Sequence, residues 1–416
     1  MSVEFDIAVQ GASAAGYVAA ISLARAGRRV ALVNSPASRT ESPLADWLPA
    51  DTLEDCPLLR SVKAPAGMDA FHELNFHSWD LKSQSTYKSR GAAGYLLETK
   101  ALLAALDAAA AKAGVRRFDM EKAPRLELQE TAVVMHGRCL QESRRRKPPA
   151  YEPCRLQSSL LLIAAGRPVE AMADLAMPIR TAPAERLSLC GLDVPLIEGK
   201  ARPELSKGLH IMSLERAGRL GFFFVVANTA HVRILSSEDE VRLVPQAARG
   251  KGGKQAQRAG GPEERAPLSM GAGAAALAEL IARLQQGGLL PAGLNLAKAR
   301  GAFWRPPGGA ALELDTLLAK RTLLVGTAGG FASATTGQTL DPTVRSALVA
   351  ADVAGKALAS ERTQDALSAY KTQWRDLLAD RIRPPGTSLQ MLLGMALSNQ
   401  AMTRRFAKAL LYGESI

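Results

Sequence analysis

The sequence predicts an α/β protein in which a parallel sheet flanked by helices is interrupted by an antiparallel sheet and followed by a C-terminal helical segment. Three observations carry this prediction. The chain opens with a strand–turn–helix–strand unit over 5–34, three strand-like runs follow one another over 208–238, and a strand, a glycine-rich turn and a helix return at 321–359. A nucleotide-binding pattern that resumes so late in the chain indicates a domain inserted between its two parts.

The opening unit has the spacing of a dinucleotide-binding turn. The strand FDIAVQ leads into GASAAG, then into an alanine-rich helix that ends at a glycine, and then into the strand RVALVN. Gly11 permits the tight turn out of the first strand, and Gly16 lets the backbones of helix and strand approach closely. Backbone N–H groups of the first helical turn can then face a pyrophosphate. The other small residues of this turn are Ala12, Ala14 and Ala15.

Two positions in this unit depart from the usual pattern. Ser13 stands where the second glycine is expected, so its side chain narrows the approach to the phosphates, although its hydroxyl can donate a hydrogen bond. Asn34 stands at the end of the second strand, where an acidic residue usually binds the adenosine ribose. Its amide oxygen can accept a hydrogen bond but brings no charge. The turn therefore predicts the fold better than it predicts the ligand.

The net charge of +12 on 416 residues has two interpretations. It could attract an anionic partner such as nucleic acid, a membrane surface or a phosphorylated ligand. Much of it lies, however, in two tracts, 144–147 and 246–266, that have the composition of mobile solvated loops. Because no aromatic residues alternate with the basic ones, we expect no nucleic-acid partner.

The cysteines and the hydropathy pattern bear on the compartment. The four cysteines are widely spaced and lack a metal-binding rhythm, which indicates unpaired thiols in a reducing compartment. They are Cys56, Cys139, Cys154 and Cys190. No secretory signal is visible, and no apolar run reaches the ~18 residues that span a bilayer. We expect a soluble, cytoplasmic protein.

The first half of the chain alternates irregular and strongly periodic segments. Residues 35–90 hold no long periodic segment, and the five-residue spacing of His72 and His77 suits neither a helix face nor an alternating strand, so we expect no metal site there. A short strand from Gly94 leads into a helix over 99–113 with its leucines on one face. Strands follow in RLELQETAVVMHG and in SSLLLIAAG.

The second half begins with the inserted domain, residues 170–300. The runs GLHIMSLE, GFFFVVAN and HVRILSSE predict an antiparallel meander with a turn at 215–219, and a helix is expected over 274–286. A buried strand at 321–326 then leads through a glycine-rich turn to a helix over 342–359. Asp341 is the expected N-cap of that helix and Pro342 its first residue.

Four blocks, in this order, resemble a group of FAD-dependent oxidoreductases. They are GASAAG, GYLLETKALLAAL, LLIAAG and LLVGTAGGFASATTGQTL. The group contains aromatic hydroxylases of the p-hydroxybenzoate type, geranylgeranyl reductases and flavin-dependent halogenases, and the reductase branch is the most similar. The resemblance covers about residues 3–412. The paired-tryptophan motif of the halogenases is absent, because Trp304 stands alone in FWRPP.

The resemblance implies a Rossmann-type FAD-binding domain with an inserted antiparallel-sheet substrate domain and a C-terminal helical segment. The FAD-binding domain would comprise 1–65 with 94–168 and 300–360. The substrate domain would comprise 66–93 with 169–299, leaving 361–416 as C-terminal helices.

The resemblance also implies FAD bound in an extended form. The first turn would hold the pyrophosphate, Asn34 the adenosine ribose, and the turn at Gly326 the ribityl chain. The backbone of 336–340 would lie beside the isoalloxazine, where amide donors and a helix N-terminus stabilise negative charge. The cofactor-binding residues so predicted are Gly11, Ala12, Ser13, Ala14, Ala15, Gly16, Asn34, Thr99, Gly166, Gly326, Thr327, Thr336, Gly337, Gln338, Thr339 and Leu340.

Departures from the family pattern leave two functions open. Polar groups that the family uses are replaced at several places, among them Asn34, Thr99, Thr327 and Thr339, and each lost hydrogen bond removes ~1 kcal/mol. One function is an FAD-dependent reductase or monooxygenase, reduced by NAD(P)H or another donor, that acts on a large, mostly apolar small molecule or lipid. The alternative is a catalytically degenerate member that serves as a binding or scaffold protein.

Catalytic residues are not identified by the sequence. No Ser/His/Asp, Cys/His or paired-carboxylate arrangement stands out, and His210 and His231 in the predicted sheet are interpreted as structural rather than facing the cavity. Residues 388–412 predict two helical stretches with one apolar face. That face either packs on its own domain or forms the wall of an apolar pocket or a weak contact with a membrane surface.

Overall fold

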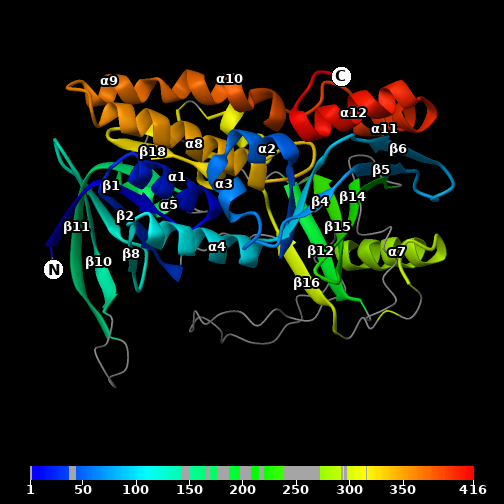
Figure 1. The fold of residues 1–416 in the computed structure, drawn as a ribbon, viewed down its shortest axis with the longest axis horizontal. Coiled ribbons are helices and arrows are strands. Elements are labelled where there is room, and N and C mark those ends of the chain that lie inside the picture. The colour runs from blue at the N-terminus through cyan, green and yellow to red at the C-terminus, as the bar shows by residue number, and fades with distance from the viewer. Residues whose placement is uncertain are drawn as a thin grey trace, which may run out of the picture.

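The computed structural model of the chain describes residues 2–36, 44–141, 150–164, 169–175, 187–196, 208–214, 220–237, 272–291, 294, 298–314 and 316–416. A parallel sheet and an antiparallel sheet lie toward opposite ends of the long axis, and the last helices run along one side (Figure 1). Both basic tracts, the turn at 215–219 and Gly166 lie outside the described residues.

The first sheet is built around the N-terminal strand. β1 (Ser2–Gln10) pairs in parallel with β2 (Val30–Asn34) on one side and with β11 (Ala150–Ile163) on the other. Helix α1 (Ala14–Arg25) connects β1 to β2, and Gly27 follows it with a φ of 81°. The predicted opening unit is confirmed. The strand order changes direction beside β1, which places the carboxyl end of β1 at the usual ligand side of such a sheet.

Further strands complete this sheet on both sides. β8 (Arg116–Asp119) pairs in parallel with β2, and β18 (Thr322–Leu324) pairs in parallel with β11. The order is β17-β18-β11-β1-β2-β8, with β17 (Leu318–Ala319) antiparallel at the edge. The late strand predicted at 321–326 therefore returns to the first sheet, although it is shorter than predicted.

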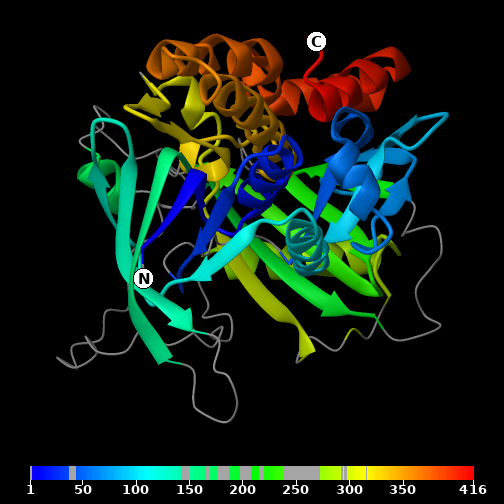
Figure 2. The same ribbon diagram turned by 60° about the vertical axis from the view of Figure 1, so that its left-hand side comes forward.

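A long hairpin extends from the first sheet and carries a disulfide. β10 (Val133–Gln141) pairs antiparallel with β11, and the hairpin projects from the body of the molecule (Figure 2). Cys139 and Cys154, on these two strands, form a disulfide. The expectation of four free thiols is wrong for this pair, because strand pairing brings their Cα atoms to 5.8 Å. Cys56 and Cys190 are free. Disulfides are typical of oxidising compartments, so the cysteines no longer support a reducing one.

Short elements fill the region between β2 and Gly94, as predicted. β3 (Ala45–Pro49) and β4 (Asp69–Phe71) flank β7 (Gly94–Glu98) in a small antiparallel sheet. Helices α2 (Ala50–Asp55) and α3 (Pro57–Val62) lie between β3 and β4 in the chain.

Helix α4 and two smaller elements cover the first sheet. α4 (Thr99–Lys112) follows β7 directly, as predicted, and packs against α1. Its buried residues Leu102 and Leu106 join the core of the first sheet. β9 (Arg125–Leu128) pairs with β10, and α5 (Val169–Asp174) packs beside β9.

The second sheet has seven strands in the order β16-β12-β15-β14-β13-β5-β6. The predicted meander is confirmed, because β13, β14 and β15 pair antiparallel in succession. The strands taken from the inserted segment are β12 (Leu187–Pro195), β13 (Gly208–Ser213), β14 (Leu220–Val226) and β15 (Thr229–Ser237). The edges are completed by β5 (Glu73–His77), β6 (Gln84–Lys88) and β16 (Arg300–Trp304).

The two faces of the second sheet have different partners. Helix α7 (Ala272–Gln286) packs on one face, where Leu277 and Leu280 join Phe223 and Val232 in a separate core. The other face, with Phe222 and Phe224 among its apolar side chains, shares its core with β3, β4, β7 and the C-terminal helices. The candidate site lies on that second face.

The late segment enters α8 (Leu340–Ala357) after two short 3-10 turns, Ala310–Leu312 and Gly326–Gly329. The predicted N-cap is wrong, because the helix begins one residue before Asp341. The Asp341 side chain does not cap the helix; it accepts from Thr52 Oγ1 at 2.7 Å and pairs with arginines. The carboxylate of Asp341 therefore forms tertiary ion pairs instead of capping the helix.

The chain ends in α9 (Thr363–Ser368), α10 (Tyr370–Ile382), α11 (Leu389–Ser398) and α12 (Gln400–Tyr412). The last two confirm the predicted helical stretches. Their apolar face packs on the second sheet, where the rings of Phe406 and Phe76 lie 5.2 Å apart. Within the described ranges, no helix combines the length and apolarity needed to cross a membrane.

Candidate functional site

The two glycine turns predicted to hold the cofactor meet in the structure. A Cβ on Gly16 would lie 1.9 Å from the carbonyl oxygen of Gly11, and a Cβ on Gly326 would lie 2.8 Å from Cβ of Ala15. Gly326 also has a φ of 60°, a conformation that side chains disfavour. The absence of a side chain at Gly326 therefore lets its turn touch the first turn of α1, and the absence of one at Gly16 lets α1 approach the end of β1.

Ser13 connects this turn to the neighbouring strand. Its hydroxyl donates to the carbonyl of Ala164, just beyond β11, at 2.9 Å and accepts from the N–H of Gly16 at 3.2 Å. Ser13 is thus the N-cap of α1 as well as the substitute for a glycine. The remaining N–H groups of the first turn, at Ala14 and Ala15, have no acceptor within the helix.

Asn34 has a partner that sequence reasoning did not identify. Its amide Nδ2 donates to the Asp119 carboxylate at 2.9 Å, because Asn34 and Asp119 lie side by side at the carboxyl ends of β2 and β8. Arg117 binds the same carboxylate at 2.9 Å and also Asp107 at 2.8 Å. The carboxylate of Asp119, on the neighbouring strand β8, therefore lies beside Asn34, the position at which the similar proteins have an acidic residue.

The third predicted segment, 336–340, reaches the second sheet. Gly337 lies against Leu189 and Pro306, and its φ of 68° is required by the turn. The side-chain amide of Gln338 donates to the carbonyl of Trp47 at 2.8 Å, and this bond is buried. This turn therefore connects the beginning of α8 with β3 and the second sheet.

The other predicted cofactor-binding residues differ in their contacts within the protein. Thr99 begins α4, and its N–H donates to the carbonyl of Leu44 at 2.9 Å. The N–H of Gly326 is already bound to Ser346 Oγ at 3.0 Å. Thr327 is partly exposed in the 3-10 turn, and Gly166 lies outside the described residues.

A small cavity of about 30 Å³ lies between the 336–339 turn and the second sheet. Aromatic side chains form part of its walls, and its two ionisable lining residues are Asp46 on β3 and Arg233 on β15. Both are buried. The aromatic residues of the lining are Trp47, Phe222, Phe224 and Trp304.

Asp46 is an unusual carboxyl group. Burial raises its pKa to about 7, although the N–H of Trp47, which donates to it at 2.8 Å, and the charge of Arg233 act in the opposite direction. A carboxyl group that titrates near neutral pH can both release and take up a proton under physiological conditions. Asp46 is therefore the strongest acid–base candidate among the described residues.

Arg233 is held by a buried ion pair on the same face. Its Nη2 lies 2.5 Å from Oδ1 of Asp193, which also accepts from Nδ1 of His231 at 2.7 Å. Gly191 makes room for it, since a Cβ there would lie 2.6 Å from Arg233 Cδ. We call Asp46, Asp193, His231 and Arg233 the sheet cluster.

The sheet cluster is incompletely satisfied. Nε of Arg233, Oδ2 of Asp193 and Nε2 of His231 are buried and have no hydrogen-bond partner among the described residues. Burial lowers the pKa of Arg233 and of His231, while Asp193 opposes both shifts. Such uncompensated polar atoms are rare in structural clusters and common where a ligand binds.

His210 on β13, like His77 on β5, belongs to this sheet but lies on the face away from this cavity. It lies on the α7 side, where its Nδ1 is 3.0 Å from Nε2 of His77. Burial lowers the pKa of His77 to about 4 and that of His210 to about 3. Among the described residues, no group of three or more His, Cys, Asp or Glu side chains could hold a metal ion.

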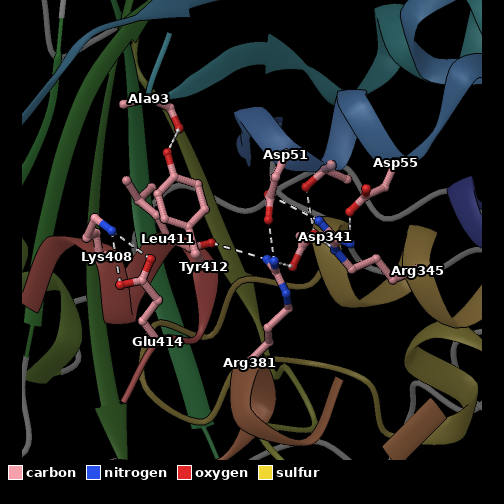
Figure 3. Close-up of polar contacts among 11 residues, drawn as sticks. Asp51, Asp55, Ala93, Asp341, Arg345, Arg381, Lys408, Leu411, Tyr412 and Glu414 are labelled. Carbon is pink, nitrogen blue, oxygen red and sulfur yellow. Dashed lines mark hydrogen bonds and ion pairs between the residues drawn. The ribbon is translucent and has the colours of Figure 1, made fainter. Parts of the chain in front are cut away.

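A second charged cluster joins the base of α8 to the C-terminal helices (Figure 3). Arg345, whose side chain is 2% exposed, binds Asp341 at 2.6 Å, Asp55 at 2.5 Å and Asp51 at 3.1 Å. Arg381 on α10 binds Asp51 and Asp341 as well. We call these five residues the helix joint, because they hold α2, α8 and α10 together.

Sequence reasoning missed Asp46, Arg233 and the helix joint. One signal was available: His231 and Arg233 are polar residues two apart in a strand that is otherwise apolar, which places both on one face. Nothing comparable marked Asp46, which lies in a stretch without periodicity.

Comparison with known proteins places the fold. No protein-family model and no curated protein matches the chain. Similar solved structures include a geranylgeranyl bacteriochlorophyll reductase-like protein from Thermoplasma acidophilum, with TM-score 0.67 and 14% identity over 100% of this chain and 93% of that one. A flavin-dependent brominase has TM-score 0.64 and 12% identity over 99% and 94%. An anhydrotetracycline hydroxylase from Streptomyces rimosus has TM-score 0.60 and 13% identity over 98% and 76%.

These identities are too low to transfer an activity, and they establish the fold alone. The fold is nevertheless the one that the four sequence blocks predicted, a Rossmann-type domain with an antiparallel sheet and C-terminal helices. The chain therefore has the fold of the flavoprotein group that contains these reductases, halogenases and hydroxylases.

Proposed function

We propose that the chain is an FAD-dependent oxidoreductase, either a reductase or a monooxygenase. One observation carries the proposal: the turn at Gly326 lies against the first turn of α1, where a Cβ on Gly326 would come within 2.8 Å of Cβ of Ala15. Backbone donors of this kind suit a pyrophosphate at the switch point of a parallel sheet.

The backbone of the two turns offers donors that suit FAD, whereas several side chains that could bind it already have partners within the protein. The glycine cradle and the free N–H groups at Ala14 and Ala15 would hold the pyrophosphate. The hydroxyl of Ser13 is already engaged with Ala164, and the N–H of Gly326 with Ser346. Backbone donors therefore carry most of the proposed binding.

Asp119 would supply the missing charge at the adenosine ribose. Its carboxylate is held by Asn34 and Arg117 at the carboxyl edge of the sheet, with about a third of the side chain exposed (36%). A ribose hydroxyl could then donate to Asp119, while Oδ1 of Asn34 accepts a second bond.

Asp46 and Arg233 would serve the chemistry on the other side of the cofactor. Bound FAD would supply electron transfer to or from the substrate. Asp46, with a pKa of about 7, would hold or release a proton at its carboxyl oxygens. Nε of Arg233 could donate to an oxygen of the substrate, and the aromatic walls would exclude water.

The substrate and partners follow from the lining. Aromatic walls with two ionisable groups suit a mostly apolar small molecule or lipid, and NAD(P)H is the reductant we propose. Contact with a membrane would be peripheral at most. A cytoplasmic location remains a prediction, against which the Cys139–Cys154 disulfide argues.

The visible absorption spectrum of the purified full-length protein, followed by titration with FAD, tests the proposal. We expect flavin bands or stoichiometric uptake of added FAD. Asp119→Asn should weaken FAD binding by about tenfold, the equivalent of ~1.4 kcal/mol. Asp107→Asn, which also removes a partner of Arg117 but does not contact Asn34, is the matched control. A colourless protein that takes up no FAD would overturn the proposal.

The second candidate is a catalytically degenerate binding or scaffold protein. The size of the sheet cavity favours it, because about 30 Å³ holds a few water molecules and not a small organic substrate. A substrate could enter only if the 336–339 turn or the aromatic walls moved. Failure to take up FAD, together with an intact fold by circular dichroism, would support this candidate.

A further inference from the structure

A larger cavity lies on the other side of the turn that borders the sheet cavity. It measures about 370 Å³, is open to solvent on one side, and is lined by the 333–335 part of the turn, the segment after α10, and the two ends of the α11–α12 pair. Thr336 to Thr339 line the sheet cavity, whereas Ser333 and Thr335 line this one. One short turn thus separates the two cavities.

Internal hydrogen bonds make this turn a compact unit. The N–H of Ser333 donates to the carbonyl of Gln338 at 2.9 Å, and the N–H of Gly337 donates back to the carbonyl of Ser333 at 2.9 Å. The hydroxyl of Ser333 also accepts from the N–H of Thr336 at 3.2 Å. Because protein interiors are closely packed, a displacement of this turn on the side of one cavity also moves its side that lines the other cavity.

The lining of the larger cavity combines an apolar floor with hydroxyl groups. Leu392, Phe406 and Leu410 from α11 and α12 supply the apolar part, and Ser333 and Thr335 supply hydroxyls. A volume of about 370 Å³ falls in the range of sites that take small organic molecules.

The charged side chains of the lining are paired within the protein. Arg381 binds Asp51 and Asp341 of the helix joint. Arg383 lies 3.5 Å from Asp380, and Glu414 lies 2.9 Å from Lys408 (Figure 3 draws the Lys408–Glu414 pair). A ligand therefore needs no charge to enter. A negatively charged one would have to compete with the largely buried pairs of Arg381, whereas the Arg383 and Glu414 pairs are exposed and weak.

We propose that this C-terminal cavity binds a neutral, mostly apolar small molecule that carries a hydroxyl or carbonyl group. The apolar body lies against Leu392, Phe406 and Leu410, and the oxygen function bonds to the hydroxyl of Ser333 or Thr335. The site is separate from the proposed cofactor groove and does not depend on the proposed function. Its occupancy stabilises the turn that forms one wall of the sheet cavity.

Binding of the neutral dye Nile red to the full-length protein, followed by its fluorescence and by competition with 1-decanol, tests the proposal. Ala409 lines the cavity, so Ala409→Phe should fill it and weaken dye binding at least tenfold. Ala401→Phe, an exposed position on the same helix outside the lining, is the matched control and should leave binding unchanged.

A second variant covers the case in which Ala409→Phe fails to fold. Gly386 also lines the cavity, and a Cβ there meets no atom within 4 Å, so Gly386→Trp should obstruct the cavity without a steric clash. Equal dye affinity in folded wild-type and folded variant proteins would overturn the proposal. Stoichiometric displacement of the dye by FAD would overturn it as well, because the dye would then occupy the proposed FAD site between the first turn of α1 and the turn at Gly326.

Discussion

The helix joint and the sheet cluster are both groups of charges around a buried arginine, but they differ in how completely those charges are compensated. In the helix joint, Arg345 contacts three carboxylates within 3.1 Å, and Arg381 contacts two of the same three. In the sheet cluster, three polar atoms on Asp193, His231 and Arg233 have no partner among the described residues.

The difference separates a structural role from a functional one. The arginines of the helix joint reach every one of its carboxylates and so connect elements distant in sequence. Its two buried atoms without a hydrogen bond, Nη2 of Arg345 and Oδ1 of Asp51, still form an ion pair with each other at 3.1 Å. The sheet cluster borders an aromatic cavity and includes Asp46, whose burial raises its pKa to about 7. Unsatisfied atoms and a displaced pKa beside a cavity are features of binding sites.

The largest effect should come from removing the centre of the helix joint. Arg345→Met would leave Asp51 and Asp341 with Arg381 alone and would remove the contact with Asp55. Because Asp341 is buried, we expect a loss of ~3–5 kcal/mol in the free energy of unfolding. Thermal and urea unfolding would measure it. Arg29→Met, which removes an exposed arginine paired with Asp6 at 2.9 Å, should cost under ~1 kcal/mol. Similar losses in both variants would contradict a structural role for the joint.

Asp46→Asn tests the sheet cluster through pH. The folded-state pKa of Asp46 is raised from 3.8 to about 7, so the unfolded chain ionises first and wild-type stability falls as the pH rises from about 4 to about 7. The variant lacks this loss and should be more stable than wild type at pH 8, by up to ~4 kcal/mol, and similar at pH 4. Urea unfolding at both pH values provides the measurement. If the stability of the variant and of the wild type changed with pH in the same way, the pKa of Asp46 would not be raised, and the prediction would be wrong.

Gly191→Ala tests whether the position of Arg233 depends on the missing side chain. The new Cβ would lie 2.6 Å from Arg233 Cδ, so Arg233 must shift and we expect a loss of ~1–3 kcal/mol by urea unfolding. Gly394→Ala on α11, where no atom lies within 4 Å, is the matched control and should add ~0.5–1 kcal/mol through helix propensity. A stabilised Gly191→Ala protein would show that Arg233 has room to move.

The smallest effect concerns a neutral contact beside the helix joint. Tyr412 donates to the carbonyl of Ala93 at 3.3 Å (Figure 3). Because the residue is partly exposed, Tyr412→Phe should cost only ~0.5 kcal/mol. Tyr370→Phe removes a fully buried bond of 3.0 Å to the carbonyl of Leu324 and should cost ~1–1.5 kcal/mol. The order of the two thermal midpoints checks the prediction, and a reversed order would contradict it.

Local signals predicted most of the fold. The opening unit, α4, the meander and the two last helices each have a periodicity that is complete within one segment, and each was found at its predicted place. The disulfide of Cys139 and Cys154 was missed because strand pairing, and not spacing, brings the two residues together. Asp341 was misassigned because two arginines and Thr52 outcompete its local capping role.

The candidate site was predictable only in part. The resemblance indicated that the turns at Gly11 and Gly326 serve one ligand, and the structure brings them into contact. It gave no indication of Asp119 beside Asn34, because the two come from strands far apart in sequence that are neighbours in the sheet. Asp46 and Arg233 were missed for the same reason.

The sequence by itself determined where this chain turns and which segments are helices and strands, because glycine conformations and apolar periodicity are local properties. Only the tertiary structure decided which charges are paired, which are left over, and which carboxyl group titrates near neutral pH. Those properties depend on distance and burial in three dimensions, and residues as far apart in sequence as Asp46 and Arg233 share one cavity only after the two sheets have come together.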